Sequence, residues 1–378
     1  MTQTPGLKKL VLLGAGHAHV QVLHGLAESR PADLDVTVIA PHPRQLYSGM
    51  VPGFVAGHYA LDQCVIPLPH LIAASGARHL PTSGIAIDPV AQTVTLAGGE
   101  TIPWNWLSIN TGPVMDRDRL EAAMPGAREH ALFVRPIEAF GQLWPQVMAL
   151  AQRQSVHLAV IGAGAAGLEL AMAAAWALRE GQAAAPCHIT LLTGGPPPAA
   201  NYPEGVRRRV LKALQRLHIT VLPDACARME PGALILASGA RLVCDAPLVA
   251  VGAQAPAWLA DSGLDLDEAG FIAVNAFQQS TSHPQVFAAG DVATRVDAPH
   301  SRSGVYAVRA GPALLANLRA MVAGDELKPW QPPQRTLNLL ACGEQYAIAA
   351  WGPFSWEGRW VWHWKDRIDR NFVARYTA

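Results

Sequence analysis

An aspartate at the end of a short apolar strand is the first feature of this chain that suggests chemistry. Residues 286–289 are expected to form a buried strand that stops at Gly290 and Asp291. Glycine has no Cβ, so backbone and ligand can approach closely at such a position. A carboxylate at the carboxyl end of a strand in an open α/β sheet can accept hydrogen bonds from sugar or ribityl hydroxyls. Taken alone, the same pattern also fits an ordinary strand end.

A glycine-rich turn follows an apolar strand expected near residues 9–13. The turn contains Gly14 and Gly16, and a helix is expected to run from it to about residue 28. The first glycine permits a tight turn, and the second lets the backbone reach a pyrophosphate at the helix N-terminus. The third glycine of the G-x-G-x-x-G pattern is replaced by His19, and the acid expected after the next strand is replaced by Ala40. The match is therefore incomplete.

A second strand, turn and helix carries the complete glycine pattern, with Gly162, Gly164 and Gly167. This spacing predicts a dinucleotide site. Glu169 lies near the start of the helix, where it either faces a nicotinamide or is simply an acid favoured by the helix dipole. Thr193 ends the following strand, so neither an acid for a ribose 2′-hydroxyl nor an arginine for a 2′-phosphate is present, and the choice of coenzyme stays open.

Polar residues beside the first turn have more than one interpretation. We interpret His17 and His19 as helix-start residues bonded to the backbone rather than as proton carriers. No third ligand accompanies them, so no metal site is predicted. The loop 41–60 is rich in proline and glycine, and loops in this position often line a cofactor. Arg44 in this loop is expected to pair with a phosphate; the alternative is a solvated cation.

Composition excludes several classes of protein. The chain has 378 residues, of which half are hydrophobic, and its 29 Lys and Arg balance 29 Asp and Glu. This length is enough for two domains with a sizeable core. Zero net charge gives no long-range attraction to nucleic acid, so no nucleic-acid partner is predicted.

The five cysteines are scattered without a C-x-x-C spacing, which predicts neither a zinc site nor a disulfide framework. No stretch is apolar over the roughly 18 residues that a spanning helix needs. The N-terminal residues run straight into a strand and are not expected to form a signal peptide. A cytoplasmic location follows as the default.

Taken together, the two glycine turns and the late "AAGD" resemble the pyridine nucleotide-disulfide oxidoreductase superfamily over almost the whole chain. The stretches "GAGHAHV", "LYSGMVPGFVAGHY", "GVYAVRAGPALLANLRA" and "WKDRIDRNFVARY" are similar to a branch often fused ahead of selenide, water dikinase. Nearer relatives resemble type II NADH dehydrogenases and sulfide:quinone oxidoreductases.

The resemblance implies an α/β fold with two Rossmann-like dinucleotide-binding domains, the second inserted in the first. An FAD-binding domain would take residues 1–135 and 265–330, and an NAD(P)-binding-like domain residues 136–264. Residues 331–378 would form C-terminal strands and an amphipathic helix. A functional link to selenide, water dikinase is implied as well.

The resemblance also implies the cofactors, FAD and NAD(P)H, and the residues that would hold them. Those expected at FAD are Gly14, Gly16, His17, Ala18, Arg44, Ser48, Gly49, Met50, Thr111, Gly112, Gly290, Asp291, Val305 and Tyr306. Those expected at NAD(P) are Gly162, Gly164, Gly167, Glu169 and Gly252. The N-terminal end of a helix expected near residues 304–321 would face the flavin.

The leading functional hypothesis is an FAD-dependent oxidoreductase that passes electrons from NAD(P)H through the flavin to an unidentified small-molecule acceptor. One alternative is an oxidoreductase of sulfur or selenium species that does not use NAD(P)H; another is a flavin-bearing electron-transfer partner. No cysteine pair lies beside either turn, so thiol–disulfide chemistry is not expected. Residues 304–309 lack the Ala-Gln pattern of the quinone dehydrogenases, which argues against quinone reduction. No catalytic residue is assigned.

The tail, residues 358–376, is expected to form an amphipathic helix. Trp360, Trp364, Ile368 and Phe372 recur every four residues, with charged residues on the other side. We expect this apolar stripe to pack on the protein, over the outer side of the flavin, because the opposite face mixes acids with bases. Membrane contact is the second option, since Trp is favoured at bilayer interfaces. It would make the protein peripheral on the inner membrane face.

Overall fold

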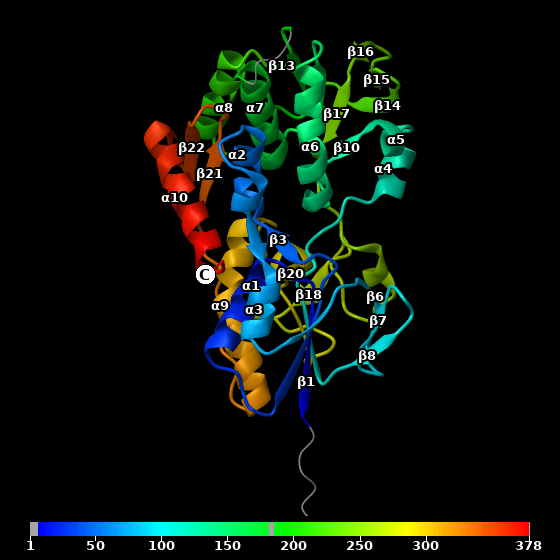
Figure 1. The fold of residues 1–378 in the computed structure, drawn as a ribbon, viewed down its shortest axis with the longest axis vertical. Helices are drawn as coiled ribbons and strands as arrows, with labels where there is room; N and C mark the ends of the chain where they lie inside the picture. Colours follow the sequence, from blue (N-terminus) through cyan, green and yellow to red (C-terminus); the bar gives the residue numbers. More distant parts are fainter. Residues whose placement is uncertain (1–6, 181–184, 378) are drawn as a thin grey trace, which may run out of the picture.

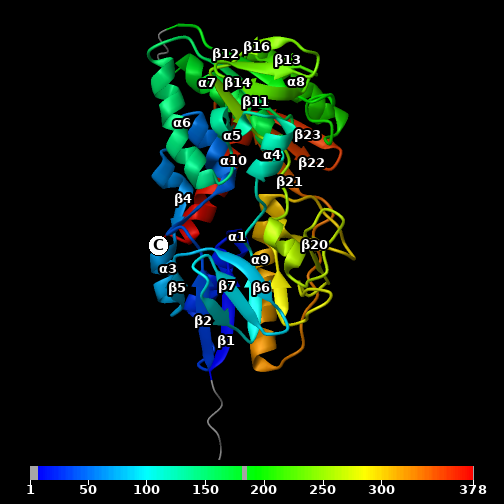
Figure 2. The ribbon, with the colours of Figure 1, turned by 90° about the vertical axis from the view of Figure 1, so that its right-hand side faces the viewer.

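The computed structural model describes residues 7–180 and 185–377. The first six residues, which the signal-peptide prediction includes, lie outside this range. The molecule is elongated, with one parallel sheet toward each end (Figure 1). In the view turned by 90°, β6 and β7 appear near β1 and β2 in the lower half, and β14 and β16 appear with β11, β12 and β13 in the upper half (Figure 2).

The first parallel sheet has the strand order β19-β9-β1-β2-β5. Strands β1, β2, β9 and β19 are mostly apolar and buried, whereas the edge strand β5 is Arg-His-Leu and only partly buried. Strands buried on both faces of a parallel sheet read as largely continuous apolar runs, as the first four do. The bounds are β1 Lys8–Leu13, β2 Leu34–Ile39, β5 Arg78–Leu80, β9 Trp106–Ile109 and β19 Val286–Ala288.

Helices α1 (His17–Glu28) and α9 (Gly304–Ala323) pack against each other beside this sheet. The α9 helix confirms the one expected near residues 304–321. Helices α2 and α3 and the two-stranded β3–β4 follow β2, and the β6–β7–β8 sheet precedes β9. Their bounds are β3 Arg44–Leu46, α2 Val51–Val55, β4 Val65–Pro67, α3 Leu68–Ala74, β6 Gly84–Asp88, β7 Thr93–Leu96 and β8 Thr101–Pro103. Two further strands, β18 Ile272–Val274 and β20 Ala293–Arg295, flank β19 in the chain.

The second parallel sheet has the order β10-β17-β11-β12-β13, with α6, α7 and α8 around it. Its bounds are β10 Leu132–Phe133, β11 His157–Ile161, β12 His188–Leu192, β13 Thr220–Leu222 and β17 Ala246–Val249. The helices are α6 Ile137–Ala151, α7 Ala165–Glu180 and α8 Glu204–Arg216. Helices α4 Arg117–Ala123 and α5 Ala127–His130, and strands β14 Cys226–Glu230, β15 Ala233–Leu236 and β16 Arg241–Val243, complete this half.

The second sheet starts earlier in the chain than the expected domain boundary. Strand β10 pairs with β17, although it precedes residue 136. Residues of α4 and α5 share a core cluster with β11 and β14. The physical reason is that Val114 already bridges to Gln254, so the chain crosses to the second half just after β9.

The C-terminal segment forms an antiparallel sheet covered by one helix. Strands β21 (Leu337–Ala341), β22 (Ala347–Trp351) and β23 (Phe354–Gly358) precede α10 (Arg359–Arg375). On β22, Ile348 and Ala350 join the core beside α7 and α8, whereas Ala347 and Ala349 join the core beside α10. Alternation along the strand therefore holds the sheet between the two layers.

The prediction that α10 lies against the protein is confirmed, and so is the inward position of Phe372, but the predicted inward position of the other three stripe residues is wrong. Trp360, Trp364 and Ile368 are 56%, 40% and 41% exposed. The buried positions include Lys365 and Asp369. A buried ion pair with a further carbonyl partner can face inward, and a hydropathy pattern does not reveal such a partner. Within the described residues, no helix is long and apolar enough to cross a membrane.

Candidate functional site

A cavity of about 1410 Å³ runs between the two halves of the molecule and reaches α10. Its wall is built from the β1–α1 turn, the carboxyl ends of β2 and β9, the start of α9, and residues of α7, β21 and α10. The sequence-predicted FAD residues in this wall are Gly14, Gly16, His17, Arg44, Ser48, Gly49, Thr111, Gly112, Asp291 and Val305. Segments far apart in the chain thus meet around one space.

The first glycine turn is held by Asn110, which sequence reasoning missed. The Asn110 Oδ1 accepts from the backbone N–H groups of Ala18 and His19 at 3.1 and 3.2 Å. Its Nδ2 donates to the Ala289 carbonyl at 2.6 Å. Gly14 has a φ of +86°, and a Cβ there would meet the Asn110 carbonyl oxygen at 2.6 Å. The only sequence signal for Asn110 is its place directly before the Thr111-Gly112 strand end.

Four of the residues expected at FAD lie outside this wall. Ala18 is fully buried, its N–H is used by Asn110, and it lies away from the described cavity wall. Met50 is also fully buried in the core beside the first sheet. Gly290 and Tyr306 border a separate space of about 10 Å³, where Tyr306 stacks on His300. These residues therefore support the cavity rather than line it.

The interpretation of His19 as a structural residue fits its contacts. Its Nδ1 lies 2.5 Å from the Gly14 carbonyl, and its Nε2 lies 2.8 Å from Ser108 Oγ. Burial lowers the pKa of His19 to about 4, so the ring is neutral. His17 is buried too: burial, with the charge of Arg135, lowers its pKa to about 4. Its Nε2 lies 3.2 Å from Ser48 Oγ, and unlike His19 it borders the cavity.

Asp291 borders the cavity close to Arg135, a second residue that sequence reasoning missed. Burial raises the pKa of Asp291, and the positive charges of Arg135 and Arg302 oppose this. Burial lowers the pKa of Arg135, with Asp291 opposing. No hydrogen bond or ion pair joins either side chain to another described residue. A carboxylate and a guanidinium that both face the cavity without protein partners suit a ligand with hydroxyl and phosphate groups.

The start of α9 also presents a polar group that has no partner among the described residues. Ser303 is its N-cap residue, and its buried Oγ has no hydrogen-bond partner among the described residues. Ser303, Gly304 and Val305 border the cavity. The unpaired Ser303 hydroxyl, the Asp291 carboxylate and the cavity-facing N-terminus of α9 together fit FAD. A helix N-terminus carries partial positive charge, which favours electron-rich groups of a bound ring.

The second glycine turn borders the same cavity through Ala165 and Ala166, whereas its three glycines are not part of the wall. Gly162 has a φ of +113°, and a Cβ at Gly167 would meet the Gly162 carbonyl oxygen at 1.9 Å, so glycine is needed there. No atom lies within 4 Å of a Cβ built at Gly164 or Gly252. The buried Oγ1 of Thr193 has no hydrogen-bond partner among the described residues. Open space beside the turn and an unpaired hydroxyl at the strand end fit the adenosine ribose of a dinucleotide.

Glu169 extends from α7 into the large cavity, toward the C-terminal sheet. Its Oε1 accepts from the backbone N–H of Ala341 at 2.8 Å. Burial raises the pKa of Glu169 to about 7, opposed by the positive charge of Lys365 and by this hydrogen bond. Sequence reasoning placed Glu169 at the nucleotide turn. Its contact with β21 and its place in the cavity wall also bring it close to α10, in the same wall as Ala165 and Ala166 of the turn.

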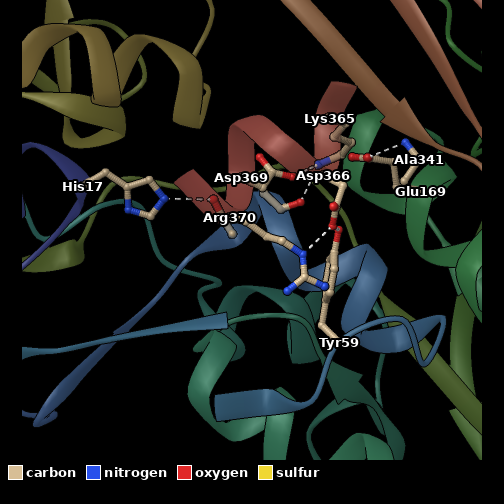
Figure 3. Close-up of polar contacts among 10 residues, drawn as sticks. His17, Tyr59, Glu169, Ala341, Lys365, Asp366, Asp369 and Arg370 are labelled. Atoms are coloured by element: carbon tan, nitrogen blue, oxygen red, sulfur yellow. Dashed lines mark hydrogen bonds and ion pairs between the residues drawn. The ribbon is translucent and has the colours of Figure 1, made fainter. Parts of the chain in front are cut away.

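A buried ion pair on α10 stands next to Glu169 (Figure 3). Lys365 Nζ lies 2.6 Å from Asp369 Oδ2 and donates to the Gly49 carbonyl at 2.6 Å. Burial alone would lower the pKa of Lys365, but Asp369 and Glu169 outweigh it, so this pKa is raised. Lys365 is therefore a fixed positive charge in the cavity wall. Nothing in the local sequence indicated this, since Lys365 was placed on the solvent face.

Aromatic and polar contacts hold α10 in this position. The ring of Phe372 stacks on Tyr47, with centroids 4.6 Å apart, and Tyr47 lies 5.2 Å from His17. Tyr59 donates to Asp366 at 2.7 Å, and Arg370 pairs with the same carboxylate at 2.8 Å. These contacts fix the tail helix, α10, as part of the cavity wall.

The cysteines stand apart from this chemistry. All five are free, and burial raises the pKa of Cys64 to about 12. Burial, with the charge of Glu169, also raises the pKa of Cys342. Thiols with such pKa values are poor nucleophiles near neutral pH. In the described ranges, 7–180 and 185–377, no group of three or more His, Cys, Asp or Glu could hold a metal ion.

Comparison with known proteins agrees with this geometry. Residues 8–311 match the family model described as pyridine nucleotide-disulphide oxidoreductase. The NADH dehydrogenase-like protein MT1860 of Mycobacterium tuberculosis is 25% identical over 310 residues, covering 78% of this chain and 75% of the relative. The ferredoxin–NAD(+) reductase component of the p-cumate 2,3-dioxygenase system of Pseudomonas putida is 28% identical over 299 residues, covering 76% and 68%.

Among solved structures, the sulfide:quinone oxidoreductase of Aquifex aeolicus has a similar fold. The TM-score is 0.81 at 18% identity, and the match covers 98% of this chain and 91% of that structure. The expected fold class, with two Rossmann-like domains, is thereby confirmed. The relatives and the residues around the large cavity both indicate FAD and a nicotinamide nucleotide as the cofactors. The chain belongs to the pyridine nucleotide-disulphide oxidoreductase family.

Proposed function

We propose that this protein takes hydride from NAD(P)H onto FAD and passes the electrons to an acceptor that enters beside α10. The observation that carries the proposal is the continuity of the large cavity. Its wall runs from Gly14 and Asp291 to Glu169 and Lys365, so a flavin site and a second, charged site share one space. FAD supplies the chemistry of accepting a hydride and releasing electrons.

The chain's own residues would hold the cofactor at the first turn. Asp291 would accept hydrogen bonds from the ribityl hydroxyls, and Arg135 would offer a positive charge nearby. Arg44 would lie at a phosphate. The start of α9, with Ser303, would present its partial positive charge to the ring. In this proposal the FAD-binding domain takes residues 1–135 and 265–330, without the α4–α5–β10 stretch, which packs with the second sheet.

The nicotinamide nucleotide would bind at the second turn, through Gly162, Gly164, Gly167 and Gly252. Residues 136–264 would supply most of this domain. Thr193 offers one neutral hydroxyl near the expected ribose, and this does not favour either coenzyme strongly.

Glu169 would serve the acceptor as a proton carrier. A group with a pKa of about 7 can hold or release a proton near neutral pH, which suits general acid–base chemistry. Lys365 keeps its positive charge through its pair with Asp369 and can stabilise negative charge that develops on an acceptor. The cavity is therefore suited to an acceptor that takes up protons when it is reduced.

Anaerobic titration of the FAD-loaded protein tests the proposal. Stoichiometric loss of the oxidised flavin absorbance on adding NADH or NADPH is the expected result. Loss only on adding sulfide or selenide would replace the proposal with the sulfur- or selenium-species oxidoreductase and would favour a link to selenide, water dikinase. No loss with any of these donors would leave only the role of a flavin-bearing electron-transfer partner.

A further inference from the structure

Tyr202 borders the large cavity, and its hydroxyl has no partner among the described residues. The residue lies in the connection between β12 and α8, where its ring packs, partly buried, against the core of the second half. The hydroxyl is not one of the fully buried polar atoms that lack a hydrogen bond, so it is accessible. The cavity wall therefore contains a phenolic donor that is free to bind a ligand.

The connection that carries Tyr202 is tied to the second glycine turn. The Ala199 N–H donates to the carbonyl of Ala163, a residue of the turn, at 3.4 Å, and the Tyr202 N–H donates to the Ala199 carbonyl at 2.9 Å. Ala199 is 2% exposed and has a φ of +57°, a left-handed conformation that is uncommon for a residue with a Cβ. This bend holds Tyr202 beside the turn.

The other end of the connection is tied to the C-terminal sheet. Arg209 on α8 pairs with Glu357 of β23 at 2.6 Å, and its Nε donates to Ser355 Oγ at 3.2 Å. Gly205, at the start of α8, packs so closely that a Cβ there would meet Ser355 Oγ at 2.9 Å. Tyr202 is thus held between two fixed segments, where the glycine turn and the C-terminal sheet approach each other.

The phenol of Tyr202 lies close to the carboxylate of Glu169. Burial, with the charge of Glu169, raises the pKa of Tyr202 to about 12, so the hydroxyl keeps its proton near neutral pH. Ala165 and Glu169 are four residues apart on α7 and lie on one face of the helix. Both border the cavity. A nucleotide that extends from the turn along this face would therefore meet Glu169 and Tyr202 together.

We propose that the Tyr202 hydroxyl donates a hydrogen bond to the carboxamide oxygen of the nicotinamide. This inference rests on the proposed function, in which NAD(P)H binds at the second glycine turn. A carboxamide oxygen is an acceptor, and a phenol that keeps its proton is a donor at any pH near neutral. One such bond would select a single orientation of the nicotinamide ring, which hydride transfer requires. The oxidised and reduced nucleotides carry the same carboxamide, so both would be recognised.

Binding of NAD⁺ to the FAD-loaded protein tests this proposal without turnover. Isothermal titration calorimetry gives the dissociation constants of the wild type and of Tyr202→Phe, which keeps the ring and removes only the hydroxyl. We expect the variant to bind about three- to tenfold more weakly, the range for one neutral hydrogen bond. The matched control, Tyr346→Phe, removes a phenolic hydroxyl outside the cavity wall and should bind like the wild type.

An analogue of NAD⁺ identifies the atom that Tyr202 contacts. In thionicotinamide adenine dinucleotide, sulfur replaces the carboxamide oxygen and is a weaker acceptor. The wild type and Tyr346→Phe should bind this analogue more weakly than NAD⁺. Tyr202→Phe should bind the two ligands within about twofold of each other, because the hydroxyl that distinguishes them is gone. Circular dichroism and FAD content confirm that each variant is folded.

Reduction of the flavin by NADH, followed in a stopped-flow instrument, separates the donor from the acceptor. Tyr202→Phe should slow this reduction and leave the KM for the acceptor unchanged. Equal NAD⁺ affinities of the wild type and Tyr202→Phe, or an effect confined to the acceptor KM, would overturn this inference and leave the proposed function standing. A wild type that neither binds NAD⁺ nor loses flavin absorbance with NADH or NADPH would overturn both.

Discussion

Glu169 on α7 and Ala341 on β21 are 172 residues apart in the chain and are joined by a 2.8 Å hydrogen bond. This contact fixes the carboxylate of Glu169 in the cavity wall that also contains Lys365 and the turn residues Ala165 and Ala166. The bond links the nucleotide half of the molecule to the C-terminal segment and gives α10 a chemical role.

The raised pKa of Glu169 predicts a pH-dependent stability. Because this carboxyl binds its proton more tightly in the folded protein, its contribution is present below the unfolded pKa, near 4.5, and is lost as pH rises toward 7. Wild type should therefore lose stability relative to Glu169→Gln over this interval, by at most about 3 kcal/mol. Glutamine keeps an acceptor for the Ala341 N–H. Thermal midpoints of both proteins at several pH values measure this, and a constant difference would contradict it.

Loss of FAD is expected for Asp291→Ala. Wild-type protein should purify with near one FAD per chain, because Asp291 offers a cavity-facing carboxylate with no hydrogen bond to another described residue. The alanine variant should lose most of the flavin absorbance while staying folded. Asp261→Ala removes an exposed carboxylate elsewhere and serves as the control. A folded wild type that is colourless and has no affinity for FAD would refute the cofactor assignment.

Arg135→Gln should weaken FAD binding about ten- to hundredfold, the range expected when one charge-assisted hydrogen bond is lost. Arg135→Lys should retain part of the affinity because it keeps the charge near Asp291. The dissociation constant comes from FAD titration of the apoprotein, with Arg119→Gln as the control. Equal affinities of the wild type and Arg135→Gln would show that this guanidinium does not face the cofactor.

Activity should not need cysteine. Cys64 and Cys342 have raised pKa values, and all five cysteines are free. A variant with every cysteine replaced by alanine should keep kcat with its best donor and acceptor within about threefold, less than 1 kcal/mol in the barrier. Single Cys64→Ala and Cys342→Ala variants give the same information if the full replacement is unstable. A folded variant without turnover would contradict the prediction.

Discrimination between NADH and NADPH should be weak. The ratio of kcat/KM values is expected to stay below roughly a thousandfold, near 4 kcal/mol. Thr193→Asp should shift the preference toward NADH, because a carboxylate at this strand end accepts from a 2′-hydroxyl and repels a 2′-phosphate. A larger ratio in the wild type would mean that a residue distant in sequence, such as Arg207, sets the choice.

The sequence alone determined the local units. The pattern around Gly14 and that around Gly162 each predicted a strand, turn and helix, and the structure contains them. Asp291 was located at a strand end in the same way. These predictions succeeded because the glycines, the apolar strand and the helix of each unit lie within about twenty residues, so short-range sterics and backbone hydrogen bonding specify them.

Tertiary structure decided the composition of the cavity. Asn110 holds the first turn from the end of another strand, and Arg135 comes from the second half, between β10 and α6. Glu169 meets Lys365 only because β21 and α10 pack beside α7. It also decided which side of α10 faces solvent. A periodic pattern specifies that a helix has two faces. The partners that Lys365 needs when it is buried with Asp369 include the Gly49 carbonyl, which comes from a distant segment. Such partners determined which face is buried.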